Sequence, residues 1–533
     1  MAEPRYLQGR QLAIVIASLW LGTMLVAIDN TIIGTAVPEI SAQFNALEDV
    51  AWYGSGYLLT VTAFGPTFGR LFKFFDPKYT YLVAIAVFEV GSVLCAAAPN
   101  SYSFIIGRAV AGAGAAGLFQ GALTIIGLTT PMEERPMYNS IVASVFGLAM
   151  GFGPPLGGVL TDSIGWRWCF WINLPIGGVV MALLFFFLHL KETHNADRKL
   201  RLLLKIKKLD FGGGFLVFAA VCSLLLALQW GGSRYKWSSP TIVGLFVTLS
   251  VVLVAFVVLQ LRLGENGTIP PRIISQRSVL MGSLLICFSQ SASMVLAYYL
   301  PFYFQAVQGT SAVVSGVRYL PLVLPQVVAL VVSGGIATKT GHYVSLMVGG
   351  QSVAAIGLGL LTKIDIHTKT VEWATYLVVS GLGIGAAATL PFAALQAVLE
   401  DEDMPVGNAI VTFFSQVGGS ISVGIAQNLF YNTVSREVRR TVDGISPELI
   451  THVGATQLRS LNLPLETLFK VRVAFSRGVS STLFLALALA AVGIFFAAGM
   501  EWKNLKVAAA ERRHKEALAR NATDDTELGG LRV

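Results

Sequence analysis

Fourteen long apolar runs constrain this chain more than any other feature of its sequence. A membrane-spanning helix needs about 20 predominantly apolar residues. Charged residues make up only 13% of the chain, against roughly 25% in soluble domains, so a single membrane anchor cannot explain the composition. We therefore predict an all-α polytopic membrane protein whose helices span residues 12–37, 51–72, 80–98, 103–128, 138–160, 170–190, 211–230, 241–262, 279–304, 315–337, 344–362, 372–396, 407–430 and 478–500.

The basic residues predict the orientation of these helices. An even number of spans places both termini on one side, and Lys and Arg concentrate in cytoplasmic segments. The two strongest basic clusters, 191–210 and the tail after Glu501, fall on the same side as the N-terminus. Both termini are therefore expected in the cytoplasm, with 431–477 as a long extracellular loop. Because the net charge of +8 lies in short loops between apolar runs, nucleic-acid binding is not expected.

An internal repeat indicates two halves. The second predicted span leads into Gly69-Arg-Leu-Phe-Lys-Phe-Phe-Asp-Pro-Lys78, and the tenth leads into Gly334-Gly-Ile-Ala-Thr-Lys-Thr-Gly-His-Tyr343. Such repeats are typical of secondary transporters, in which the substrate site lies between the halves. The expected divisions are a six-helix bundle at 1–190, a basic loop with two inserted helices at 191–277, a second six-helix bundle at 278–500 and a tail at 501–533.

Four ionisable residues inside the spans stand out, because charges in a bilayer are costly. Of these, Arg318 lies near the outer end of its span, where its side chain can reach the interface, and Asp29, Glu89 and Arg108 are the candidates for function. Asp29 and Glu89 can titrate if loss of solvent raises their pKa values. Arg108 cannot release its proton at any working pH, so it would instead tune a nearby carboxylate. The alternatives are a structural ion pair for Arg108 and local hydrogen bonds for the two acids.

Polar and aromatic side chains within the spans are candidates for a substrate cavity. Aromatic walls with a few polar anchors suit organic, partly apolar ligands. Hydrogen bonding between helices or core packing explains any one of them equally well. The predicted cavity residues are Asn30, Gln120, Asn173, Gln290, Tyr298, Tyr299, Tyr303, Gln305, Gln396, Phe413 and Gln416.

Motifs for enzymatic or ATP-driven chemistry are missing from the sequence. It contains no GxxxxGK[ST], HExxH or GxSxG pattern, and its four cysteines form no CxxC pair. We expect no enzyme activity, no cofactor and no metal site.

Several motifs together resemble the major facilitator superfamily, specifically its fourteen-span drug:proton antiporter branch. They are Asp29-Asn-Thr-Ile-Ile-Gly-Thr-Ala-Val-Pro38, Gly107-Arg108, Gly153-Pro-Pro-Leu-Gly-Gly158 and Trp166-Arg-Trp-Cys-Phe-Trp-Ile-Asn-Leu-Pro-Ile-Gly177. The resemblance implies two six-helix bundles with two inserted linker helices, and transport by alternating access. In the family the arginine motif, here Gly107-Arg108, is linked to proton coupling, and we expect either Asp29 or Glu89 to take up the proton under the influence of Arg108.

The resemblance assigns the proline- and glycine-rich run to an antiporter motif made of Gly153, Pro154, Pro155, Gly157 and Gly158. In the family this motif is linked to antiport. A bend there would seal the outer half of the fifth helix against its neighbours and suppress proton leak.

The family also has a gating loop after the second helix, which here corresponds to Gly69, Arg70, Lys73, Asp76 and Lys78. The chain departs from the usual pattern, because Lys73 stands where the family has an aspartate. This variant, and the ending Gly499-Met-Glu-Trp-Lys-Asn-Leu505, resemble fungal efflux pumps for toxins and secondary metabolites.

The expected function is proton-coupled export of a lipophilic organic compound across the plasma membrane. The expected partners are that small molecule, protons and the bilayer, with a monomeric protein. The alternatives are an importer or vacuolar loader of the same fold, carrying a siderophore or a basic amino acid, and a membrane receptor that transports nothing.

Overall fold

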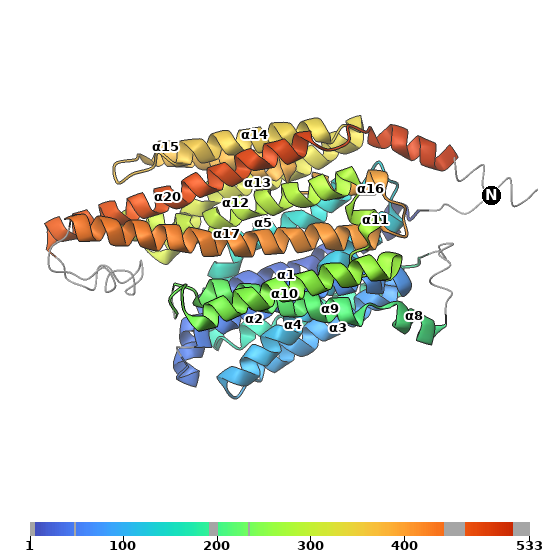
Figure 1. The fold of residues 1–533 in the computed structure, drawn as a ribbon, viewed down its shortest axis with the longest axis horizontal. Helices are drawn as coiled ribbons and strands as arrows, with labels where there is room; N and C mark the ends of the chain where they lie inside the picture. The colour runs from blue at the N-terminus through green and yellow to red at the C-terminus, as the bar shows by residue number, and fades with distance from the viewer. Residues whose placement is uncertain (1–5, 47–48, 191–200, 233–234, 442–463, 515–533) are drawn as a thin grey trace, which may run out of the picture.

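The computed structural model describes residues 6–46, 49–190, 201–232, 235–441 and 464–514. Helices make up nearly all of these ranges, and they contain no β-strand beyond isolated bridges. Figure 1 shows two bundles, with the first half of the chain in blue and cyan and the second half in yellow to red.

The first bundle contains six spanning segments. Its helices are α1 (Gly9–Phe44), α2 (Val50–Phe74), α3 (Pro77–Ala96), α4 (Ser101–Thr129), α5 (Arg135–Ile164), and the pair α6 (Trp168–Trp171) and α7 (Asn173–Phe187), which together form the sixth. We name the two ends of the bundles by the expected orientation, so that the start of α1 is at the inner end.

The second half repeats this arrangement after an insertion. The insertion contains α8 (Leu202–Lys208), α9 (Phe211–Trp230), α10 (Pro240–Leu263), a 3-10 turn (Gly264–Asn266) and α11 (Pro271–Ile274). The second bundle contains α12 (Arg277–Phe302) with a π-helical turn (Tyr303–Val307), α13 (Ala312–Thr340), α14 (Val344–Leu361), α15 (Thr370–Ala387), α16 (Leu390–Val398), α17 (Met404–Thr441) and α20 (Leu465–Ala498).

Thirteen helical segments of the described part are long and apolar enough to cross a membrane. The remaining predicted span is α2, which is 25 residues long and carries hydroxyl and glycine residues among its apolar ones. It packs between α4 and α17 inside the protein, so it needs less apolar surface than a lipid-facing helix. The prediction of a six-plus-two-plus-six helical fold is confirmed.

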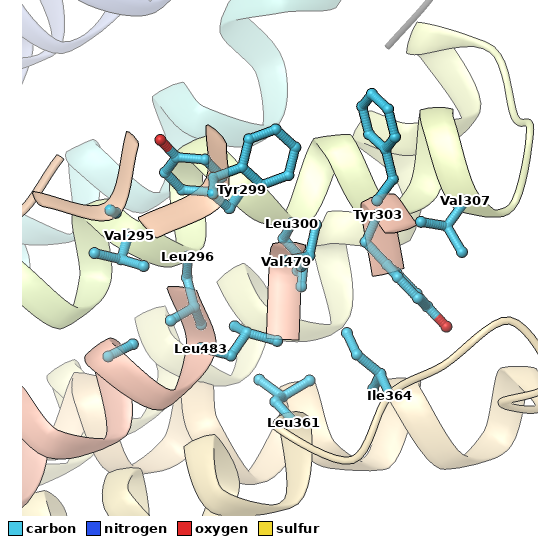
Figure 2. Packing of buried hydrophobic residues seen from close by; sticks show 14 of the residues in the cluster. Val295, Leu296, Tyr299, Leu300, Tyr303, Val307, Leu361, Ile364, Val479 and Leu483 are labelled. Atoms are coloured by element: carbon cyan, nitrogen blue, oxygen red, sulfur yellow. The ribbon is translucent and has the colours of Figure 1, made fainter. Parts of the chain in front are cut away.

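Each half has its own apolar core. In the second half, side chains of α12, α14, α17 and α20 pack together, as Figure 2 shows around Leu300 and Val479. Small residues let the helices approach closely. A Cβ atom at Gly91 of α3 would overlap the backbone of Ala111 in α4, and one at Gly383 of α15 would overlap the backbone of Ala354 in α14.

The two halves meet along α2 with α17 and along α5 with α13. Two glycines of the internal repeat occupy equivalent places in these contacts. A Cβ atom at Gly69 would lie 3.1 Å from the carbonyl oxygen of Pro405 in α17. At Gly334 it would lie 2.8 Å from the carbonyl oxygen of Pro136 in α5. Both contacts lie at the inner end of the molecule, so the repeat forms two equivalent close contacts between the halves there, α2 with α17 and α13 with α5.

The insertion contacts both halves of the protein. At the inner end, the Arg70 guanidinium of α2 donates to the carbonyl oxygens of Glu265 and Asn266, each at 3.0 Å. At the outer end, Trp237 Nε1 donates to Asn428 Oδ1 of α17 at 3.0 Å. Arg272 of α11 also pairs with Asp403 of the second half at the inner end, and Trp230 packs on Trp52 of α2 at the outer end. The insertion therefore bridges the two bundles at both ends.

The expected extracellular loop 431–477 is shorter in the structure. Helix α17 continues to Thr441, and α20 begins at Leu465. The helices extend past the apolar runs because they pack on each other there through buried Val434, Val438 and Val471. Arg477 and Glu437 also form an ion pair between them. Residues 442–463 lie outside the described part.

Candidate functional site

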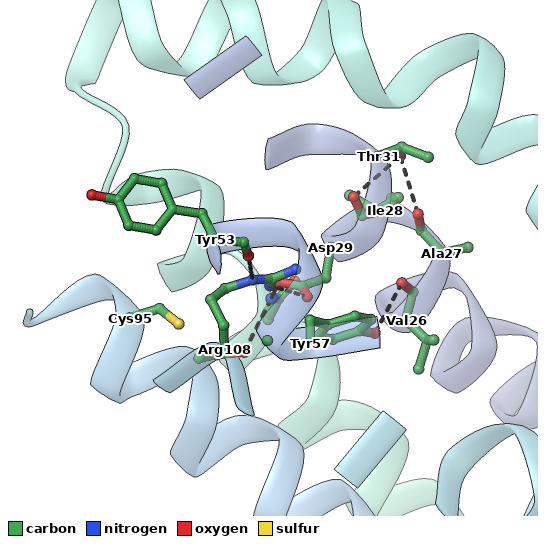
Figure 3. Close-up of polar contacts among 12 residues, drawn as sticks. Val26, Ala27, Ile28, Asp29, Thr31, Tyr53, Tyr57, Cys95 and Arg108 are labelled. Carbon is green, nitrogen blue, oxygen red and sulfur yellow. Dashed lines mark hydrogen bonds and ion pairs between the residues drawn. The ribbon is translucent and has the colours of Figure 1, made fainter. Parts of the chain in front are cut away.

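A buried ion pair between Asp29 and Arg108 lies inside the first bundle. Arg108 Nη1 donates to Asp29 Oδ2 at 2.5 Å, and both side chains are fully buried. Arg108 Nε donates to the carbonyl oxygen of Tyr53 at 3.0 Å. The guanidinium also lies over the Tyr57 ring, 4.3 Å from its centroid. Figure 3 shows these groups converging from α1, α2 and α4.

Small residues of α4 bring Arg108 this close to its neighbours. A Cβ atom at Gly107 would meet the Cys95 amide nitrogen at 2.8 Å, and one at Gly112 would overlap the Tyr57 carbonyl and the Thr60 hydroxyl. The pair is therefore sealed from water. Removing one partner of a buried ion pair typically costs about 3–5 kcal/mol, because it leaves an uncompensated charge.

Helix α7 joins the second carboxylate to this pair. Asn173 Nδ2 donates to Ser92 Oγ at 3.1 Å and lies 3.5 Å from Asp29 Oδ1. One turn inward on the same face, Gly177 leaves room for the Glu89 side chain of α3. Both Glu89 carboxylate oxygens are buried without a hydrogen-bond partner among the described residues. The structure thus brings Asp29, Glu89 and Arg108 together and adds Asn173, which the sequence had assigned to the substrate cavity.

A third carboxylate, that of Asp49, connects this region to the outer end. Ser101 Oγ donates to Asp49 Oδ2 at 2.5 Å, and Tyr53 Oη donates to Ser101 Oγ at 3.0 Å. Asp49 also lines an open hollow of about 880 Å³ formed by the outer ends of α1 and α2. The carbonyl oxygen that accepts from Arg108 also belongs to Tyr53, so the hydrogen bonds through Ser101 and Asp49 help to fix the position of Tyr53 beside Arg108.

The antiporter motif divides between two faces of an unbroken helix α5, with Pro154 and Pro155 inside it. Gly153 and Gly157 face α1, where a Cβ atom would overlap Thr31 at the first and Thr35 at the second. By contrast, a Cβ atom at Gly158 would meet no atom within 4 Å. Two of the motif's glycines therefore set the spacing between α1 and α5, and the third does not.

At the inner end, Lys73 forms an ion pair with the other half. Lys73 Nζ donates to Asp403 Oδ1 at 2.7 Å, and Arg272 Nη2 donates to Asp403 Oδ2 at 2.5 Å. Burial alone would raise the pKa of Asp403, but the hydrogen bonds from Lys73 and Arg272 outweigh it and hold that pKa below its usual range. The position of the family's aspartate is thus held by a lysine whose partner carboxylate directly precedes α17 in the other half.

A second set of ion pairs also joins the two halves at the inner end. Arg135 at the start of α5 lies 3.4 Å from Asp401 of the second half, and Arg512 of the tail lies 3.2 Å from the same carboxylate. Arg513 pairs with Glu133 of the first half. We call Lys73, Asp403, Arg272, Arg135 and Asp401 the inner gate.

The described part of the tail packs on the rest of the protein. Residues 505–514 are helical, and buried Leu505 and Ala509 pack with Met132 of the first half. The Leu505 amide donates to the Gly341 carbonyl oxygen at 3.0 Å. The tail thus contacts both halves at the inner gate, and residues 515–533 lie outside the described part.

Only part of the predicted gating loop contacts the other half. Gly69 and Lys73 do so, whereas Arg70 binds the insertion. Asp76 caps α3 by accepting from the Lys78 amide at 2.8 Å. Lys78 Nζ donates to the Phe185 carbonyl oxygen at 2.7 Å, within the first bundle.

Two predicted cavity residues lie elsewhere. Tyr299 and Tyr303 are buried in the apolar core of the second bundle, as Figure 2 shows, and Tyr303 Oη donates to the Asp365 carbonyl oxygen at 2.9 Å. Their assignment to a cavity wall is wrong for this conformation. A tyrosine with one paired hydroxyl packs well in a core, and an apolar helix does not indicate which face does so.

The other predicted cavity residues vary in exposure. Gln120 and Gln396 are buried at the contact between halves, and Thr412 Oγ1 donates to Gln120 Oε1 at 3.4 Å. Phe413 packs against α2 and α9. Asn30 and Tyr298 are exposed, and Gln290, Gln305 and Gln416 are half-buried.

Sequence reasoning missed the acids and arginines of the inner gate. Asp401, Asp403, Arg135 and Arg272 lie just outside the predicted spans, and the search for functional charges stayed inside them. One sequence pattern could have pointed to charges at this end of the helices. An acidic residue, Glu134 or Asp403, stands two residues before a proline in the first turn of a long helix. No cluster that could hold a metal ion occurs in the described part of the chain.

The fold and the buried charges define a polytopic transporter of the two-bundle class. The family model of the Major Facilitator Superfamily matches residues 19–423. The chain belongs to this superfamily.

Curated relatives match over nearly the whole length. The "MFS-type efflux pump MFS1" of Arthroderma benhamiae is 43% identical over 505 residues, covering 94% of this chain and 93% of the relative. The "Rubrofusarin-specific efflux pump aurT" of Gibberella zeae is 40% identical over 504 residues, covering 95% and 92%. The "Efflux pump roqT" of Penicillium rubens is 40% identical over 489 residues, covering 92% and 90%.

Solved structures share the fold at low identity. The proton:xylose symporter XylE, bound to 6-bromo-6-deoxy-D-glucose, matches with a TM-score of 0.59 and 13% identity, over 93% of this chain and 98% of that one. The human organic anion transporter MFSD10 matches with a TM-score of 0.55 and 12% identity, over 91% and 100%.

Proposed function

We propose that this protein is a proton-coupled exporter of a lipophilic organic compound. The observation that carries the proposal is the sealed pair of Asp29 and Arg108. Glu89 lies nearby against Gly177, one turn along α7 from the Asn173 that contacts Asp29. Relatives named as efflux pumps support the direction of transport. The antiporter motif, of which Gly153 and Gly157 pack against α1, also favours export.

Protons would act on this site through the counter-charge of Arg108. Protonation of Asp29 leaves the guanidinium without a carboxylate in a membrane span, which is a costly arrangement. The protonated protein therefore favours another arrangement of α1 and α4. Glu89, whose oxygens have no hydrogen-bond partner among the described residues, would receive the proton inward of Asp29.

Access from the outer side would begin at the hollow that Asp49 lines. The inner gate is closed by its ion pairs in this structure. Protons would thus enter while the cytoplasmic side is sealed, and cargo would enter after the gate opens. We further propose that the protein acts as a monomer in the plasma membrane, with both termini in the cytoplasm, as the basic inner segments suggest.

Efflux measured with and without a proton uncoupler tests the coupling. Cells that express the protein would be loaded with a fluorescent lipophilic compound, and the rate of its loss followed. We expect the uncoupler to abolish the extra efflux. Efflux that continues unchanged while the uncoupler collapses the proton gradient would refute proton coupling.

Arg108→Ala should abolish coupled efflux while the protein still reaches the membrane. Arg318→Ala is the matched control, because Arg318 also lies in a predicted span but its described hydrogen-bond partner is the neutral side chain of Gln308. Normal proton-driven efflux by Arg108→Ala would show that this arginine has no part in coupling.

A further inference from the structure

Four buried amides lie in the inner parts of helices that meet across the two halves, α4 with α17 and α5 with α16. Gln120 and Asn139 come from the first half, and Gln396 and Asn408 come from the second. Each is at most 1% exposed. Of their amide atoms, only Gln120 Oε1 has a hydrogen-bond partner among the described residues. We call these four side chains the amide column.

Helical register places the four amides above the inner gate. Met404 contacts Arg135 at 3.2 Å, and Asn408 and Asn139 follow these two residues by one turn on parallel helices. One turn further along α17, Thr412 contacts Gln120. At 1.5 Å per residue, the distance along α17 from Met404 to Thr412 is about 12 Å. Gln396 lies on α16 near the inner end of this stretch.

Such a group of unpaired amides is unfavourable in a sealed interface. Buried polar groups nearly always have partners, and an orphaned group loses its hydration without compensation. The buried amide of Gln351, by contrast, is paired. Gln351 in the second bundle receives a hydrogen bond from Ser289 and donates one to the Ala490 carbonyl oxygen. The amide column is thus built for a state in which something else binds it.

The surroundings define what that partner can be. The four helices carry no Asp, Glu, Lys, Arg or His in 109–128, 136–161, 390–398 or 404–435, so a charged cargo group would find no counter-charge in these stretches. Aromatic rings lie beside the column, with Phe119 5.5 Å from Phe146 and 6.3 Å from Phe392 between ring centroids. Amides both donate and accept hydrogen bonds.

We propose that the amide column is the cargo-recognition site that opens when the inner gate opens, and that it selects neutral aromatic compounds carrying both hydroxyl and carbonyl groups. This proposal rests on the proposed export function. Hydroxyl groups would bind the amide oxygens, carbonyl groups would bind the amide nitrogens, and the rings would pack on the phenylalanines. Release of cargo and closure of the gate would leave the amides unpaired again, as they are here.

Binding of three probes to the purified full-length protein tests the selectivity. 6-Hydroxyflavone carries a donor and acceptors, 6-methoxyflavone carries acceptors only, and ethidium is a cation. We expect the wild type to bind 6-hydroxyflavone most tightly. Asn408→Leu should weaken that binding about tenfold and leave 6-methoxyflavone within about twofold.

Thermal unfolding separates this role from a structural one. Because Asn408 has no partner in the closed state, Asn408→Leu should raise the midpoint by about 1–2 °C. The matched control Gln351→Leu removes a paired amide outside the column, so it should lower the midpoint and leave the preference among the probes unchanged.

Three results would overturn the proposal: a lower midpoint for Asn408→Leu, an equal loss of binding for both flavones, or a wild type that binds neither flavone. The uncoupler experiment keeps this outcome separate from the proposed function. Uncoupler-sensitive efflux with no effect of Asn408→Leu on probe binding would reject the column alone. Efflux that is insensitive to the uncoupler, with the expected probe selectivity, would reject proton coupling alone.

Discussion

Replacing Lys73 with methionine would remove one of the two cations that hold Asp403 at the inner gate. The side chains of Lys73 and Asp403 are only 10% and 5% exposed, so their interaction is weakly screened. Loss of one partner from a buried pair costs about 3–5 kcal/mol. Because Arg272 still donates to the other carboxylate oxygen, we expect a smaller cost to the closed state of about 1–3 kcal/mol. That corresponds to a shift of about 5- to 150-fold toward the inward-open state.

Labelling of a buried cysteine measures this shift. Met404→Cys, placed in a background in which the four native cysteines are replaced, puts a thiol where only 1% of the residue is exposed. Its rate of reaction with a maleimide, normalised to the rate for denatured protein, reports opening of the inner side. Lys339→Met is the control, since it removes an exposed lysine at the inner end of α13 for which no ion pair is found in the described part.

A double-mutant cycle decides whether the effect comes from the ion pair. Lys73→Met and Asp403→Asn should each speed labelling, and the double variant should be no faster than the stronger single variant. If the two effects simply add, or if Lys73→Met labels at the wild-type rate, Lys73 and Asp403 do not hold the gate together.

Three further predictions follow from the same contacts. Gly157→Ala places a Cβ atom 2.6 Å from the Ile32 carbonyl oxygen, so it should cost about 1–3 kcal/mol of stability and slow efflux, whereas Gly158→Ala should be neutral in both assays. The charge of Asp403 should persist from pH 5 to pH 8, because its lowered pKa means that its ion pairs are lost only as the pH falls below the usual aspartate pKa of about 3.9. Normalised labelling of the gate should therefore be flat over this range, and a rise near pH 6 would contradict the assignment. Arg513→Glu should shift the equilibrium between the closed and open gate toward the open state by no more than about 1 kcal/mol, since the arginine is 68% exposed. Adding Glu133→Arg to the same chain should restore the wild-type labelling rate.

The sequence predicted the number, order and grouping of the spanning helices because apolar length is a direct requirement of the bilayer. It also singled out Asp29, Glu89 and Arg108 as candidates for function, because ionisable residues inside a span are rare. It did not predict that Asn173 joins them, because this depends on how α7 is rotated.

Other failures have the same physical origin. Tyr299 lies on α12, where serines and a glutamine are mixed with apolar residues rather than gathered on one face, and Tyr303 lies in the π-helical turn that follows. Periodicity therefore does not reveal which face of this segment enters the core. Asp403 was missed because it lies outside the apolar run, at a helix start that only the folded protein brings to Lys73. The prediction that Gly69 and Gly334 belong to equivalent repeats, by contrast, needed only the sequence.

The insertion limits how far the bundles can move apart. Its inner end is hydrogen-bonded to α2 through Arg70, and its outer end to α17 through Trp237. The insertion also contacts the other half at each end, since Arg272 pairs with Asp403 at the inner end and Trp230 packs on Trp52 at the outer end. A movement that parts the two bundles at either end must therefore break the contacts that the insertion makes there with one of them.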